Sequence, residues 1–179
     1  MTLPSTFFRR LALLGALAIA LPGLALELFR ANTEEAEKYV FDDTNAFRGE
    51  HGQRELAVDK TLAATAQRFA DYMARTGKYA HDADGRTPGQ RLRAAGYDYC
   101  MVAENIAFAF DSRGFRTQHL SDKFVDGWKA SPGHRKNMLD AEATVTGVAI
   151  AQSPLNGYYY AVQMFARPTR YNRCPPAKK

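Results

Sequence analysis

Cysteine is scarce in this sequence, and several familiar motifs are missing. Two cysteines among 179 residues are too few for a disulfide-dense miniature scaffold or a four-thiolate zinc site. No segment repeats with a period of about 20–50 residues, which excludes a solenoid or a propeller. The G-x-S-x-G elbow, the P-loop, the dinucleotide-binding glycine pattern and the H-E-x-x-H helix are also absent. These absences remove most common enzyme classes.

Long runs of one charge are absent too. The formal net charge is +5, but acidic and basic residues are mixed along the chain, and no basic run exceeds two residues. The sequence therefore lacks the electrostatic footprint of a protein that binds nucleic acid. Hydrophobic residues make up 46% and charged residues 24%, which is typical of one globular domain with a substantial core.

Residues 1–25 are predicted to be a cleaved signal peptide. Arg9-Arg10 precede an apolar run from Leu11 to Leu21, and small residues follow, with cleavage expected after Ala25. The apolar stretch is shorter than the ~20 residues of a membrane span, so an uncleaved anchor is the less favoured alternative. We expect a secreted or periplasmic protein without a stable membrane anchor, exported by the twin-arginine or the general route. A linker is expected over residues 26–35.

If the protein is exported, its two cysteines can form a structural disulfide. In an oxidising compartment Cys100 and Cys174 are expected to pair. The bridge would close a loop of about 75 residues and add roughly 4 kcal/mol in the chain-entropy model. It would also tie the polar C-terminal tail, residues 169–179, to the domain. The alternative, a nucleophilic Cys100, needs a partner base that the neighbouring sequence does not supply.

Hydrophobic periodicity and capping residues predict helices in the first two thirds of the chain. The expected helices cover Ala36–Phe47, Asp59–Gly77, Thr87–Gly96, Leu120–Trp128 and Ser131–Leu139. Val145–Ala151 and Tyr158–Phe165 are predicted strands of an antiparallel hairpin, and Val102–Phe110 is expected to be a strand or extended segment. Helices first and a hairpin last, without strand–helix alternation, indicate an α+β domain.

Three polar residues are candidates for a functional site. Glu104 lies in an apolar segment, where a buried carboxylate needs a cationic or imidazole partner. His134 is expected near the N-terminus of a short helix that Ser131 caps through its hydroxyl, which disfavours Ser131 as a nucleophile and keeps the imidazole neutral. His81 follows the second helix. Together the three could form a divalent-metal site with open positions or a general acid/base cluster.

The spacing of these residues is long, so a structural imidazole remains the simplest interpretation of any single histidine. His51 and His119 are assigned that structural role.

The sequence resembles the CAP superfamily of cysteine-rich secretory, antigen 5 and pathogenesis-related 1 proteins, and is most similar to its bacterial SCP-like secreted branch. The segments that carry the resemblance, in family order, are Asn45–Arg48, Leu62–Met73, Tyr79–His81, Ala103–Ala107 and Trp128–Leu139. It covers roughly Phe41 to Phe165 and implies a CAP domain over residues 36–168. The implied fold is an α-β-α sandwich with a central antiparallel sheet and an open cleft.

The resemblance also implies a cleft with two histidines and two glutamates. His81, Glu104 and His134 match three of these positions, and Ser131 occupies the fourth, which weakens the case for a four-residue acid/base mechanism. Some relatives bind zinc or other divalent ions through the two histidines, and others bind sterols or fatty acids. No single activity unites the family.

The sequence leads to three alternative hypotheses for the function. The first is a non-enzymatic, exported ligand-binding domain in which His81 and His134 coordinate zinc or another divalent cation beside Glu104. The second is a metal-dependent hydrolase that acts on peptide or cell-envelope material, with Glu104 as the base. The third is a sterol or fatty-acid carrier. The ligand, whether a small molecule, a lipid or a cell-envelope component, and the oligomeric state stay open.

Overall fold

A four-stranded sheet forms the middle layer of the protein. The computed structural model describes residues 30–169 and 173–174. The sheet has the order β1-β3-β4-β2 and comprises β1 (Ala57–Val58), β3 (Val145–Gln152), β4 (Tyr159–Pro168) and β2 (Tyr99–Ala109). The signal peptide expected over residues 1–25 lies outside the described residues, as does most of the tail.

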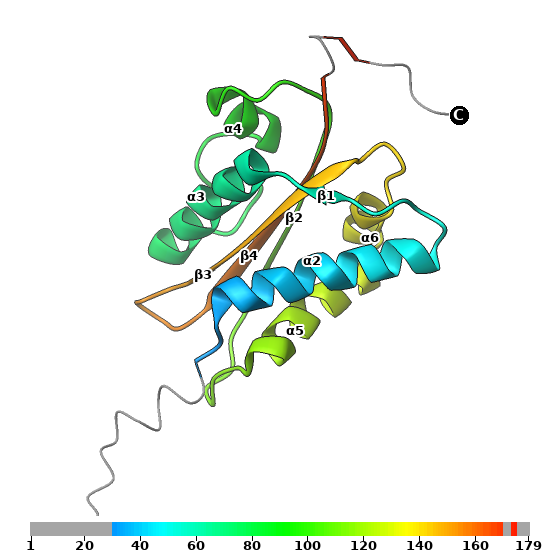
Figure 1. The fold of residues 1–179 in the computed structure, drawn as a ribbon. Helices are drawn as coiled ribbons and strands as arrows, with labels where there is room; N and C mark the ends of the chain where they lie inside the picture. The colour runs from blue at the N-terminus through cyan, green and yellow to red at the C-terminus, as the bar shows by residue number, and fades with distance from the viewer. Residues whose placement is uncertain (1–29, 170–172, 175–179) are drawn as a thin grey trace, which may run out of the picture.

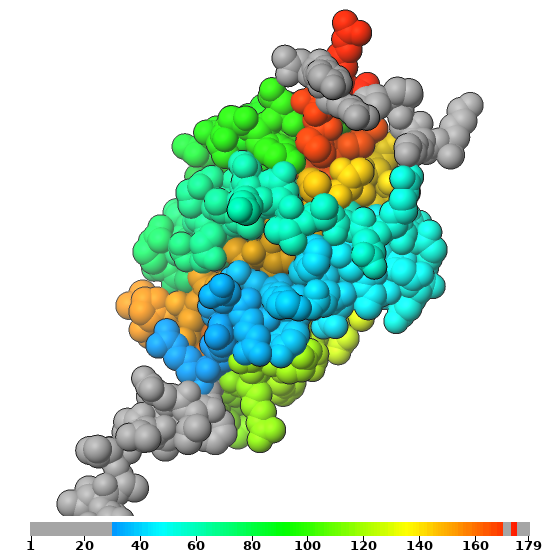
Figure 2. Space-filling view, viewed as in Figure 1, coloured from blue at the N-terminus to red at the C-terminus, as the bar shows by residue number. Residues whose placement is uncertain are grey.

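Helices cover both faces of this sheet (Figure 1). One face packs against α2 (Thr33–Glu50), α5 (Thr117–Ala130) and α6 (Pro132–Met138), and the other against α3 (Lys60–Thr76) and α4 (Pro88–Ala94). In the space-filling view only a narrow band of the sheet is visible between α2 and α3 (Figure 2). The expected α-β-α sandwich is confirmed. No helix in the described part of the chain is both long enough and apolar enough to cross a membrane.

The central strand β4 shows why the sequence forms this sandwich. All residues from Tyr159 to Ala166 are buried, and alternate side chains enter opposite cores. Tyr159 and Phe165 belong to the core under α2 and α5, whereas Val162 and Met164 belong to the core under α3. A strand covered on both faces needs a continuous apolar run, which is why this segment was predictable.

The predicted ends of α3 and the predicted start of α4 are present. The Asp59 side chain accepts hydrogen bonds from the backbone N–H groups of Thr61 and Leu62, and Gly77 ends α3 in the left-handed conformation at φ 69°. Thr87 and Gln90 form the expected capping box of α4. These local signals place the loop between α3 and α4, which carries His81.

One strand of the sheet was not predicted from sequence. β1 has only two residues and pairs with β3 in the parallel direction, so the sheet is antiparallel except at this edge. A two-residue strand has no measurable alternation, so no periodicity marks it. The strand or extended segment expected over residues 102–110 is confirmed as a strand up to Ala109: it belongs to β2, the opposite edge strand, which pairs antiparallel with β4.

The expected disulfide is present between Cys100 and Cys174, whose Cα atoms are 5.3 Å apart. Cys100 lies at the beginning of β2, so the bond attaches the C-terminal segment to the edge strand that carries Glu104.

Gly147 of β3 lies directly against α3. A Cβ atom there would overlap the backbone nitrogen of Ala63 and lie 2.5 Å from the carbonyl carbon of Leu62. We therefore expect Gly147→Ala to lower the free energy of unfolding by about 3 kcal/mol, measured by urea denaturation. The control Gly127→Ala, on a helix face with nothing within 4 Å, should raise it by about 0.5–1 kcal/mol. Equal stability of the two variants would contradict this close approach.

Candidate functional site

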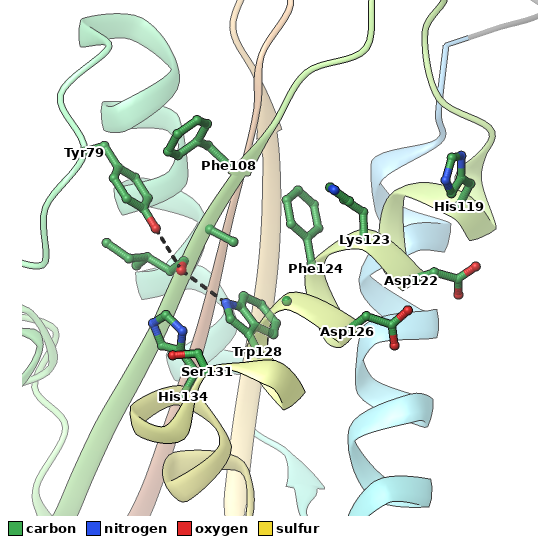
Figure 3. Close-up of a pocket in the computed structure, with 13 residues that line it drawn as sticks. Tyr79, Phe108, His119, Asp122, Lys123, Phe124, Asp126, Trp128, Ser131 and His134 are labelled. Atoms are coloured by element: carbon green, nitrogen blue, oxygen red, sulfur yellow. Dashed lines mark hydrogen bonds between the residues drawn. The ribbon is translucent and has the colours of Figure 1, made fainter.

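The site lies along the outer edge of β2. Tyr79, from the loop after α3, and Trp128, from α5, both donate to the backbone oxygen of Ile106, at 3.0 Å and 3.1 Å. Figure 3 shows the two side chains converging on that oxygen. Asn137 of α6 donates to the backbone oxygen of Glu104 at 3.2 Å. Side chains from both helical layers therefore hydrogen-bond to the edge of the strand, and they fix the loop that carries His81 and the helix that carries His134.

Glu104 is buried, with a side chain that is 1% exposed, and has the partners that its apolar surroundings predicted. Its Oε1 is 2.8 Å from Nδ1 of His81, and its Oε2 accepts a hydrogen bond from Arg91 at 2.7 Å. Both carboxylate oxygens are therefore engaged by neighbouring side chains. This arrangement offsets the cost of burying the charge.

Arg91 is the site residue that the sequence analysis missed. Its guanidinium donates to Glu104, to Asp84 Oδ1 at 2.8 Å, and to the backbone oxygens of His81 and Arg86 at 2.9 Å and 2.8 Å. It also lies 3.6 Å from the centre of the Phe69 ring. Arginine in a short helix normally points to solvent, and no local signal distinguishes Arg91 from its neighbours.

His81 is held in one orientation by its bond to Glu104. A carboxylate accepts the proton on Nδ1, so the neutral ring carries a free lone pair on Nε2. The side chain is 51% exposed, which leaves this nitrogen accessible to solvent. The loop that carries His81 is fixed in turn, because Arg91 donates to its backbone oxygen.

His134 comes from the opposite helical layer. It is half-buried, and burial lowers its pKa. The ring is therefore neutral at pH 7, as expected, but burial rather than the helix terminus is the main cause. The backbone oxygen of His134 accepts from Asn105 at 3.2 Å, and Asn105 is bonded to Asn137. These two asparagines anchor α6 to β2.

Ser131 differs from the sequence-based expectation. It occupies the N-cap position of α6, but its side chain makes no capping hydrogen bond. The hydroxyl instead lies beside His134 at the rim of a cavity (Figure 3). The preceding helix α5 continues to Ala130, so Ser131 alone joins α5 to α6. This short junction determines the backbone direction at Ser131, and the side chain is not needed for it.

The cavity next to the histidines has a volume of about 520 Å³. Its walls include Tyr79, Phe108, Phe124, Trp128, Ser131 and His134. Glu104 and His81 are not among the residues that line this cavity. Burial raises the pKa of the Tyr79 phenol, so the phenol stays neutral and donates to Ile106.

The other two histidines have separate surroundings. Nδ1 of His51 is 2.8 Å from the backbone oxygen of Phe47, and its Nε2 is 2.9 Å from the Arg135 guanidinium. His119 contacts the edge of the Phe115 ring and lines the cavity. Neither is paired with an acidic side chain in the described part of the chain.

The donor set limits how a metal could be held. Among residues 30–169 and 173–174, no three histidine, cysteine, aspartate or glutamate side chains are grouped to hold a metal ion. Glu104 is not available as a third ligand, because Arg91 and His81 engage its oxygens. A cation at this site would therefore depend on imidazole ligands, with its other positions taken by water or a ligand.

The family model of the cysteine-rich secretory protein family, CAP, matches residues 41–165. A curated relative, "Uncharacterized protein YkwD" of Bacillus subtilis (strain 168), is 30% identical over 118 residues, covering 65% of this chain and 43% of the relative. The chain thus spans less than half the length of this relative.

Solved structures show the same fold. An extracellular protein containing a SCP domain from Bacillus anthracis str. Ames is 27% identical, with a TM-score of 0.64 over 75% of this chain and 41% of that protein. NaASP2, in a crystal structure with Zn²⁺, is 17% identical, with a TM-score of 0.55 over 74% of this chain and 80% of that protein. With most of its described residues inside the matched segment, the chain belongs to the cysteine-rich secretory protein (CAP) family.

Proposed function

We propose that this chain is an exported, non-enzymatic CAP domain that binds its ligand in the cleft through a divalent cation held by His81 and His134. The observation that carries the proposal is the pair between Glu104 Oε1 and His81 Nδ1, which leaves Nε2 as the free nitrogen of a side chain that is 51% exposed. A metal-binding histidine is typically oriented in this way by a carboxylate.

Two further observations support a cation at this place. His134 is half-buried, and burial lowers its pKa, so its ring is neutral at pH 7. Neutral imidazole is the form that binds metals. NaASP2, which shares the fold, has been crystallised with Zn²⁺. A cation with open positions would supply a Lewis-acidic point for an oxygen-bearing ligand.

The hydrolase alternative has less support from the geometry. It requires Glu104 to accept a proton from water, whereas both of its oxygens are engaged and its side chain is 1% exposed. Glu104 acts instead as a positioning residue for His81. The lipid-carrier alternative predicts a patch of exposed aliphatic side chains. Val58 and Leu155 are the large aliphatic residues exposed in the described part of the chain, and single exposed residues of this kind are ordinary.

Export is the second part of the proposal. It rests on the sequence of residues 1–25 and on the disulfide, which persists in oxidising compartments. The structural relative from Bacillus anthracis is an extracellular protein, which agrees with a secreted or periplasmic location.

Zinc titration tests whether His81 and His134 hold a cation in the cleft. We expect the full chain to bind one Zn²⁺, and His81→Ala or His134→Ala to weaken that binding by at least about tenfold, because each removes one of two protein ligands. Isothermal titration calorimetry measures the affinity. His119→Ala is the matched control, since His119 lines the neighbouring cavity without an acidic partner. Equal Zn²⁺ affinity of all three variants and the wild type would refute the two-histidine site.

A further inference from the structure

A second cavity, of about 560 Å³, lies between α3 and α4, which lie side by side on one face of the sheet (Figure 1). Five of its thirteen lining residues are basic, and one, Asp84, is acidic; the basic residues are Lys60, Arg68, Arg75, Arg86 and Arg91. We call this cavity the basic groove. None of the residues that line it lines the cavity beside His134.

Most of the positive charge in the basic groove is not neutralised. Asp84 is already paired with Arg91, whose second acidic partner is Glu104. Within the described residues, the four other basic side chains of the groove form no ion pair. Arg68 donates to the hydroxyl of Thr65, which carries no charge. Like charges gathered without counter-charges repel one another, and an anionic ligand would relieve that repulsion.

The groove is long as well as basic. Lys60, Arg68 and Arg75 lie along one face of α3. At 1.5 Å per residue, they are spaced about 12 Å and 10 Å apart along the helix axis. The small side chains of Ala64, Ala94 and Ala95 line the space between the helices. This arrangement suits an extended ligand with several charges better than a single compact ion.

The Arg91 side chain lies in a fixed position at the base of the groove. It is 5% exposed and lies over the Phe69 ring, and its Nε has no hydrogen-bond partner among the described residues. The four exposed basic residues lie around Arg91 and form no ion pair within the described residues, so they are available to an anion. A buried polar group without a partner marks a place where a ligand can supply one.

We propose that the basic groove binds an extended polyanion that carries phosphate groups. Guanidinium groups bind phosphate oxygens in bidentate geometry, and three of the unpaired basic residues of the groove are arginines. Arg91 belongs to both sites, because its guanidinium also donates to Glu104, but the exposed basic residues of the groove are separate from His81 and His134.

Two probes test the proposal in buffer containing EDTA, so that no metal contributes. Sodium tripolyphosphate presents phosphate in solution, and vesicles of phosphatidylcholine and phosphatidylglycerol present it on a lipid surface. We expect the full chain to bind at least one probe, and Arg68→Gln with Arg75→Gln to weaken that binding by about tenfold. Glutamine is a good helix former, and both positions are exposed, so this variant folds.

The matched control is Arg116→Gln with Lys136→Gln, which removes the same charge from exposed positions outside the groove. It should retain the affinity of the wild type, and so should His81→Ala with His134→Ala. Binding of tripolyphosphate indicates a free ligand, and binding of vesicles alone indicates a lipid head group. If neither probe binds, or if the control loses as much affinity as the groove variant, the proposal is overturned.

Discussion

Replacing Arg91 by methionine should lower the free energy of unfolding by about 3–5 kcal/mol, because it removes the partner of two acidic side chains. Glu104 would keep a charge in a side chain that is 1% exposed, and Asp84 would keep one that is 19% exposed. Methionine is close in length to arginine and retains contact with the Phe69 ring, so the loss reports mainly the uncompensated charge. Urea denaturation measures it.

Two further variants separate charge from packing. Arg93→Met, on the same helix but exposed and without an ion pair in the described residues, should change stability by less than about 0.5 kcal/mol. Adding Glu104→Gln to Arg91→Met should restore part of the loss, since it removes one of the unpaired charges. A loss at Arg91 no larger than at Arg93 would show that the Glu104 network does not stabilise the fold.

Removal of the disulfide has the second large effect. Replacing Cys100 and Cys174 together by serine should lower the free energy of unfolding by about 4 kcal/mol, because the bond closes a loop with a sequence separation of 74. Most of this loss of stability comes from the unfolded chain, which gains conformational entropy when the disulfide no longer closes the loop. Denaturation of the oxidised wild type and of the double variant measures the difference.

Reduction provides an internal control for the same prediction. Wild-type protein treated with dithiothreitol should unfold like the double serine variant, and dithiothreitol should leave that variant unchanged. If the oxidised and reduced wild type unfold at the same denaturant concentration, the bond is not a significant source of stability. The anchor that it gives to β2 would then be unimportant for the site.

Local signals in the sequence were sufficient for most of the fold. Capping by Asp59 and Thr87 depends on side chains within three residues of the helix start, and the continuous burial of β4 is visible as an apolar run. Interactions of this range can be read from a sequence. β1, with two residues and a pairing to β3 far along the chain, has no local signal.

The candidate site was predictable in part. Glu104 was expected to have a cationic or imidazole partner, and it has both. Which basic residue would pair with Glu104 was not predictable, because Arg91 reaches Glu104 only after α4 packs against the α3 layer. Asn105 and Asn137 were likewise missed, since their bond joins positions 32 residues apart. Hydrogen bonds of this kind are determined by the tertiary fold.

Imidazole nitrogen spectra test the cleft most directly. Long-range ¹⁵N–¹H spectra of the full chain, recorded during addition of Zn²⁺, follow each histidine ring separately. The account predicts that the signals of His81 Nε2 and of one His134 ring nitrogen shift together and saturate at one equivalent, while His51 and His119 stay unchanged. Unchanged signals of His81 and His134, or shifts led by His51 or His119, would contradict the assignment of the cleft as a cation site.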